Sequence, residues 1–147
     1  MTARRAGRDH GTATIEFVLV ALLLLVPLAY VLIAALDVQR AAYAVGQAAR
    51  TGARAFVTAP STAVGRERAQ RAAVLALADQ GVPPDTLRVE VRCSAQPCLT
   101  PSASVTVVVS CVARLPLAPE VLGRPVAAVP VRAEQELTVE PYDVRRP

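Results

Sequence analysis

An uninterrupted apolar segment near the N-terminus constrains this chain more than any other feature. Residues 17 to 36, twenty in all, contain no charged side chain. At a helical rise of about 1.5 Å per residue they extend about 30 Å, the hydrocarbon thickness of a bilayer. A buried core helix of this kind needs a large protein around it, and the chain has only 147 residues. We therefore expect a membrane-spanning helix at 17–36.

A cleavable secretory signal is a second interpretation of the same segment. Such signals have a shorter apolar region, of about 7–15 residues, followed by a small-x-small cleavage site. Ala42-Tyr43-Ala44 would suit such a cut and would release a soluble protein, but it lies beyond Asp37 and Arg40. The length of the run and these charges favour an anchor that stays in the membrane.

The basic residues that flank the run predict its orientation. Arg4, Arg5 and Arg8 precede it, and Arg40 and Arg50 follow it. Cytoplasmic flanks carry the excess of positive charge. The excess on the N-terminal side predicts a cytoplasmic N-terminus and an extracytoplasmic C-terminal part, as in an inserted signal anchor.

Helical periodicity continues after the apolar run, to about residue 57. Small or apolar residues recur every three or four positions, while most arginines lie off this stripe. The stripe consists of Val38, Ala42, Val45, Ala49, Gly52 and Phe56. We expect one long helix within residues 12–57, apolar all round in its first half and amphipathic in its second.

A linker and a second helix are expected next. Residues 58–65 contain Pro60 and Gly65, which disfavour regular structure. Residues 66–80 form an amphipathic pattern that Gly81 and two prolines end. Its apolar side is expected to hold Ala69, Ala73, Leu77 and Gln80, joined by Ala72, Val74 and Leu75.

Three strand patterns complete the chain. Residues 87–93 and 131–140 alternate apolar and charged side chains, which is typical of half-exposed strands. Residues 104–113 are apolar at nearly every position and rich in β-branched side chains, which indicates a central strand. The fold class is therefore α+β: a long N-terminal transmembrane and amphipathic helix, a second helix and a small three-stranded antiparallel sheet.

The three cysteines fit an oxidising compartment. Cys93 and Cys98 bracket a short polar segment, and a five-residue separation can close a small disulfide loop. The strand order places Cys111 at the far end of the neighbouring strand, which favours Cys93–Cys98 over Cys93–Cys111. Cys111 is then expected as a small buried apolar residue. A zinc site needs more ligands, and the single histidine, His10, lies before the apolar run, on the other side of the expected membrane span.

No pattern in the chain predicts chemistry. A catalytic serine, histidine and acid set is missing because His10 is the only histidine, and no glycine-rich loop suits a phosphate. With five aromatic residues and scattered arginines, the chain also lacks the features of a nucleic-acid site. We expect a non-enzymatic protein with no cofactor, no bound metal and no nucleic-acid partner.

Glu16, at the start of the apolar run, is the residue that most needs an explanation. A charge within a spanning helix costs about 2.5–3.5 kcal/mol at the centre and less near the edge. One interpretation is an interfacial acid in the first helical turn, where it complements the helix dipole. A second interpretation depends on Gly11, which lies five residues earlier and ends a basic leader.

The leader that ends at Gly11, followed by Thr12-Ala13-Thr14-Ile15-Glu16-Phe17 and an apolar helix, resembles the type IV prepilin signal. The segments AARTGARAF (48–56) and VRAEQELTVEPY (131–142) are similar to TadE-like minor pilins, or pseudopilins, of the tight-adherence (Tad/Flp) system, of actinobacterial type. The resemblance is strong over residues 8 to 57 and loose beyond them.

The resemblance implies a role for each residue of the signal. A prepilin peptidase of the membrane would cut after Gly11, on the cytoplasmic side, which makes Thr12 the new N-terminus and Glu16 the fifth mature residue. Glu16 would then pair with the Thr12 amine of a neighbouring subunit. The family usually has Glu-Tyr where this chain has Glu16-Phe17, so this chain keeps the aromatic ring and lacks the tyrosine hydroxyl.

The implied protein is a structural component of pilus assembly, adhesion or secretion. Its partners would be the peptidase, other pilin subunits, the Tad assembly platform and the lipid bilayer. Its parts would be a leader (1–11), a long helix (12–57), a linker (58–65) and an extracytoplasmic domain (66–147), at the cell membrane or in a surface pilus. The alternative is a single-pass, signal-anchored surface protein with a small binding module, which has no use for cleavage at Gly11.

Overall fold

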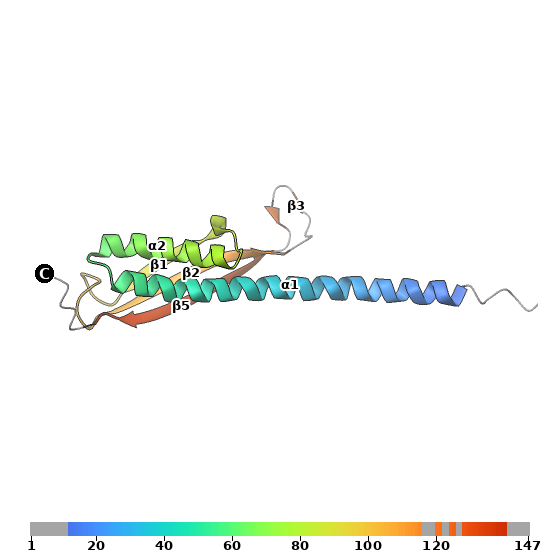
Figure 1. The fold of residues 1–147 in the computed structure, drawn as a ribbon, viewed down its shortest axis with the longest axis horizontal. Helices are drawn as coiled ribbons and strands as arrows, with labels where there is room; N and C mark the ends of the chain where they lie inside the picture. The colour runs from blue at the N-terminus through green and yellow to red at the C-terminus, as the bar shows by residue number, and fades with distance from the viewer. Residues whose placement is uncertain (1–11, 116–119, 122–123, 126–127, 141–147) are drawn as a thin grey trace, which may run out of the picture. The chain divides into compact units, whose positions relative to one another are not determined.

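The computed structural model describes residues 12–115, 120–121, 124–125 and 128–140. It confirms the predicted α+β class, with a long apolar N-terminal helix, a second helix and a three-stranded antiparallel sheet (Figure 1). The chain divides into two compact units, Met1–Ala35 and Leu36–Pro147. The elements are α1 (Thr12–Val57), α2 (Thr62–Asp79), the 3₁₀ helix η1 (Pro84–Thr86), β1 (Arg88–Cys93), β2 (Ser104–Arg114), β3 (Glu120–Val121), β4 (Arg124–Pro125) and β5 (Ala128–Thr138).

The first unit is the N-terminal part of α1. Phe17 and the valine, leucine and isoleucine side chains between Ile15 and Ile33 have exposed fractions of 49% to 74%. Pro27 lies inside the helix and cannot donate its share of the backbone hydrogen bonds. None of the described residues of this unit buries this apolar surface, which is of the kind that contacts a membrane or another protein.

The second half of α1 supplies one wall of the core in the second unit. Most of its buried residues are alanine or glycine, which lets the helix approach its neighbours closely. They are Ala41, Ala44, Val45, Ala48, Ala49, Gly52, Ala53 and Phe56. The expected stripe was wrong at Ala42, which is exposed, because the buried arc passes through Ala41 one turn before Val45.

The second helix, α2, begins earlier than predicted. Ser61 takes the N-cap position in an extended conformation, and its side chain accepts a hydrogen bond from the Val64 amide. Residues 62–65 are therefore helical, and the expected linker at 58–65 is shortened. The predicted buried positions Ala69, Ala73 and Leu77 are confirmed.

The far end of α2 departs from the expected pattern in two residues. Gln80 is exposed and caps the C-terminus, and Leu75 is 65% exposed. Gly81 follows with a φ of +67°, a left-handed conformation that glycine adopts without steric cost. This turn reverses the chain toward η1 and β1.

The sheet has the order β1–β2–β5, and both pairings are antiparallel. Central β2 buries Val105, Val107 and Val109 on the face that joins the helices in one apolar core. The edge strands β1 and β5 alternate exposed and partly buried residues, as their sequences predict. Figure 1 shows α2 and the second half of α1 lying over this sheet.

Three short elements were not predicted. The 3₁₀ helix η1 leads into β1, and Thr86 accepts a hydrogen bond from the Val112 amide of β2 at 2.9 Å. The strands β3 and β4 pair with each other within the segment that joins β2 to β5. These elements are only two or three residues long, too short to show a periodic pattern.

Candidate functional site

The predicted processing point lies at the start of the described structure. Gly11 is outside the described residues. Thr12 is the first residue of α1. Glu16 is the fifth residue of this helix, and four positions along a helix bring two residues to the same face, about 6 Å apart along the axis.

Glu16 is exposed and has no partner among the described residues. Its carboxylate forms no hydrogen bond or ion pair there, and the first described basic residue, Arg40, comes 24 positions later. The first turn of α1 contains no acidic residue, because the helix already begins at Thr12. The expectation of a first-turn acid was therefore wrong: Glu16 lies in the second turn, where the helix dipole acts less strongly.

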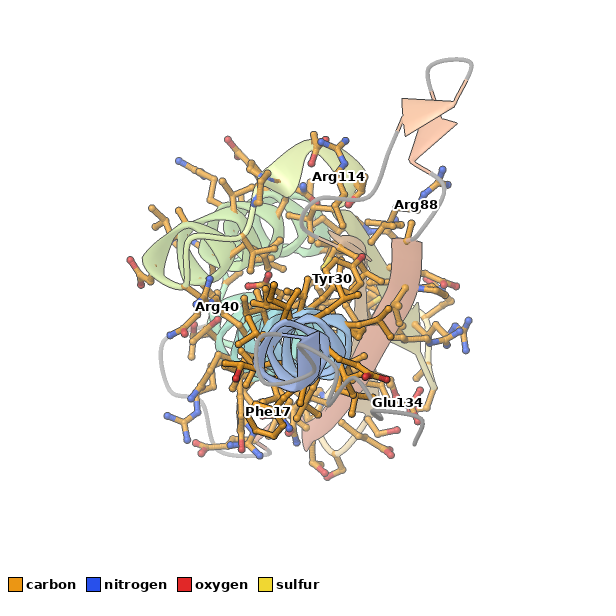
Figure 2. All side chains as sticks on the ribbon, turned by 90° about the vertical axis from the view of Figure 1, so that its right-hand side faces the viewer. Phe17, Tyr30, Arg40, Arg88, Arg114 and Glu134 are labelled. Atoms are coloured by element: carbon orange, nitrogen blue, oxygen red, sulfur yellow. A yellow bond between two sulfur atoms is a disulfide. The ribbon has the colours of Figure 1, made fainter. Side chains whose placement is uncertain are left out.

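Phe17 and the residues that follow it form an apolar surface around the helix. Phe17 is 74% exposed, and Figure 2 looks along α1 from this end, with the side chains radiating from the axis. Among the described residues, α1 is the one helix that is both long enough and apolar enough to cross a membrane. No residue of its most apolar stretch is buried. The chain is thus compatible with a single-pass membrane anchor.

The structure joins Cys93 to Cys98 by a disulfide, with their Cα atoms 5.2 Å apart. The bond closes the segment that follows β1, and Cys98 is buried. Cys111 is a free, buried thiol on β2, opposite Val131 of β5. Burial raises the pKa of the Cys111 thiol, with a smaller contribution from Asp85, so the thiol stays protonated and inert at neutral pH.

The described residues include no group of three or more histidine, cysteine or acidic side chains placed to hold a metal ion. The sites that the structure does present are therefore an unpaired acid on an apolar helix, a disulfide loop and a set of surface ion pairs. None of them places a nucleophile beside a base, which is the arrangement that covalent catalysis requires.

Sequence reasoning missed a pocket with charged walls at the start of the second unit. The pocket has a volume of about 200 Å³, and four of its residues are charged: Asp37 and Arg40 of α1, Asp85 of η1 and Arg114 of β2. From the sequence, Asp37 and Arg40 were interpreted as charges that flank the apolar run and not as parts of a binding site. No local pattern predicts that residues 85 and 114 lie beside them, because their meeting depends on sheet register.

Comparison with known proteins adds no relative: no protein-family model, curated protein or solved structure matches the chain. The function proposed below is therefore argued from the residues of this chain and their placement.

Proposed function

We propose that this protein is a TadE-like minor pilin, or pseudopilin: a membrane-anchored structural component of a Tad/Flp pilus or secretion assembly. The N-terminus of its anchor is cytoplasmic, the second unit is extracytoplasmic, and the protein is not an enzyme. The observation that carries the proposal is Glu16, an exposed and unpaired carboxylate on a helix that otherwise presents only apolar side chains to its surroundings for about thirty ångströms.

The ionised carboxylate of Glu16 is energetically costly at the edge of a bilayer. An ionised group at the edge of a bilayer is destabilised unless it gains a partner, and none is available within the described chain. Cleavage after Gly11 creates an ammonium group on Thr12, one helical turn from Glu16. The carboxylate of one subunit then pairs with the Thr12 ammonium of the next, and their attraction is strongest where water is excluded.

Such a pair specifies register as well as affinity. The side chains around it are apolar and pack almost equally well at several axial offsets, whereas the ion pair forms at one offset only. Burying an unpaired charge is costly, so misaligned neighbours are disfavoured. The exposed apolar surface from Ile15 to Ile33 supports both uses of the helix, as an anchor in lipid and as a packing surface in an assembly.

The deciding experiment is the mass of the mature N-terminus. The full chain is expressed with and without an active prepilin peptidase, and the N-terminal peptide is identified by mass spectrometry. We expect a peptidase-dependent chain that begins at Thr12. An uncut chain beside an active peptidase would refute the proposal and leave a signal-anchored surface protein.

The role of Glu16 is tested separately from cleavage. Glu16→Gln keeps the shape of the side chain and removes its charge, and we expect normal cleavage with loss of the protein from the assembled fraction. Glu67→Gln is the matched control, because Glu67 is an exposed acid of α2 paired with Arg71 at 3.0 Å, far along the chain from the signal. Normal assembly of Glu16→Gln would exclude the charge pair.

A further inference from the structure

The charged pocket at the start of the second unit is built by three parts of the chain. Its apolar walls include Ala41 and Val82, both buried, and Ala113 of β2. Its rim carries Asp37 and Arg40 from α1, Asp85 from η1 and Arg114 from β2. Figure 2 labels Arg40 and Arg114, which come from different elements and both line the pocket. The volume of about 200 Å³ accommodates several water-sized groups.

The four charged side chains form two ion pairs on the protein surface. Arg40 lies 3.3 Å from Asp37, and Arg114 bonds to Asp85. Their side chains are between 29% and 57% exposed. Exposed pairs of this kind contribute little net stability, so a ligand that offers both charges can replace them at small cost. The formal charge of the four groups is zero.

The position of the pocket along the chain determines which part of the membrane lies beside it. Asp37 follows Leu36 directly, the last residue of the apolar run. The polar layer of a bilayer is about 5–7 Å thick on each side of the hydrocarbon, and residues 37 to 40 rise about 4.5 Å along a helix. An α1 that spans the membrane therefore places Asp37 and Arg40 among the lipid headgroups, whichever way the chain is oriented.

We propose that the charged pocket binds the headgroup of an aminophospholipid of the phosphatidylethanolamine class. The guanidinium groups of Arg40 and Arg114 donate hydrogen bonds to the phosphate, and the carboxylates of Asp37 and Asp85 accept hydrogen bonds from the primary ammonium. This inference rests on the membrane anchor alone and not on pilus assembly.

The balance of charges selects this headgroup over its competitors. An anionic headgroup such as phosphatidylglycerol brings a phosphate without a cation, which leaves the two carboxylates unmatched. Phosphatidylcholine brings a quaternary ammonium that cannot donate hydrogen bonds and that proteins usually bind with aromatic rings. No aromatic residue is among the described residues that line the pocket. Of these three headgroups, only the one with a primary ammonium beside its phosphate offers a hydrogen-bonding partner to all four groups.

The test uses the full chain in nanodiscs that contain equal amounts of the three lipids. Native mass spectrometry after release counts the lipids that each protein molecule retains. We expect the wild type to retain phosphatidylethanolamine about tenfold more often than either competitor, the ratio that one charge-assisted hydrogen bond supports. Arg40→Gln with Arg114→Gln removes this preference. The control, Arg66→Gln with Arg68→Gln, makes the same charge change on α2, outside the pocket, and keeps it.

The reciprocal variant makes the sharpest prediction. Asp37→Asn with Asp85→Asn leaves the pocket with two positive charges, so its preference moves from phosphatidylethanolamine to phosphatidylglycerol. Equal retention of all lipids by the wild type would overturn the proposal, and so would a wild-type preference for phosphatidylglycerol. If inorganic phosphate displaced the lipid as readily as glycerophosphoethanolamine does, the pocket would recognise only the phosphate, and the proposal would again be overturned.

These measurements are independent of pilus assembly. A chain that is never cleaved at Gly11 still carries the charged pocket beside its anchor and is still expected to retain the aminophospholipid. Far-UV circular dichroism and the intact mass of the Cys93–Cys98 disulfide form verify that each variant is folded before its lipids are counted.

Discussion

Gly65 allows the contact between α2 and α1 to be tested by the addition of a single methyl group. A Cβ atom at Gly65 would lie 3.0 Å from Cδ2 and 3.2 Å from Cε2 of the Phe56 ring, and 3.2 Å from the Phe56 carbonyl oxygen. Carbon atoms in good contact are about 3.5–4.0 Å apart. Phe56 is fully buried, so its ring has little room to move. Gly65→Ala therefore forces α2 away from α1 or distorts the ring.

The magnitude follows from two opposing contributions. Replacing glycine by alanine within a helix stabilises it by up to about 1 kcal/mol. Overpacking a well-filled core costs about 1–3 kcal/mol. Gly46 of α1 isolates the first contribution, because a Cβ there meets nothing within 4 Å. We expect Gly46→Ala to raise the free energy of unfolding and Gly65→Ala to lower it, with about 2 kcal/mol between the two variants.

The assay is urea unfolding of the full chain in a mild detergent, followed by far-UV circular dichroism. At the usual urea dependence of about 1–3 kcal/mol per molar, the two midpoints differ by about 1 M. Adding Phe56→Leu removes the ring edge, so Gly65→Ala becomes less costly in that background, with a coupling of at least about 0.5 kcal/mol. The reasoning is refuted if Gly65→Ala stabilises the protein as much as Gly46→Ala does.

Three further outcomes are expected. Ser61→Ala removes the hydroxyl that accepts a hydrogen bond from the Val64 amide at 3.4 Å. Because this bond is long and exposed, we expect the free energy of unfolding to fall by about 0.5–1 kcal/mol in the same urea assay. An unchanged urea midpoint would contradict the capping role of Ser61. Burial raises the pKa of the Cys111 thiol, so iodoacetamide at pH 8 should modify this thiol only in denaturant, and rapid labelling of the native protein would contradict this. The unfolded thiol loses its proton first, so the free energy of unfolding should fall as the pH rises above about 8.5, the ordinary pKa of cysteine. The hydrogen bond from Arg92 lowers the pKa of the Glu90 carboxyl, so an NMR titration should give a midpoint below the ordinary value, and Arg92→Gln should move that midpoint upward.

Much of the fold could be predicted because periodicity reports burial directly. The apolar run, the alternation in β1 and β5 and the continuous apolar sequence of β2 each correspond to one environment in the structure. Boundaries were harder. Residues 62–65 were predicted as part of a linker because Pro60 precedes them and Gly65 is among them. Ser61 nevertheless provides an N-cap, and the helix begins at Thr62. Pro60 precedes the cap and does not interrupt the helix.

Alanine-rich sequence explains the error at Ala42. Ala41 and Ala42 are chemically identical, so composition cannot indicate which of them faces the core. The choice is made by larger neighbours such as Val45 and Phe56, which fix the direction of the buried arc. The charged pocket could not be predicted at all, since its charged residues come from three elements that only the tertiary structure brings together. Cleavage at Gly11 and the pairing of Glu16 stay predictions, because both depend on other molecules.

Among the described strands, β5 pairs with β2 on one side only, and its other edge has a consequence for the proposed membrane-anchored protein. Anchored copies meet one another at a high effective concentration, and a bare strand edge of 11 residues would invite them to stack into β aggregates. Pro130 has no N–H to donate, and Arg132, Glu134 and Glu136 occupy successive exposed positions of the strand. These residues make the edge a poor template for another strand. On the proposed function, anchored copies therefore meet without stacking through β5, and their association is left to other surfaces such as the apolar half of α1.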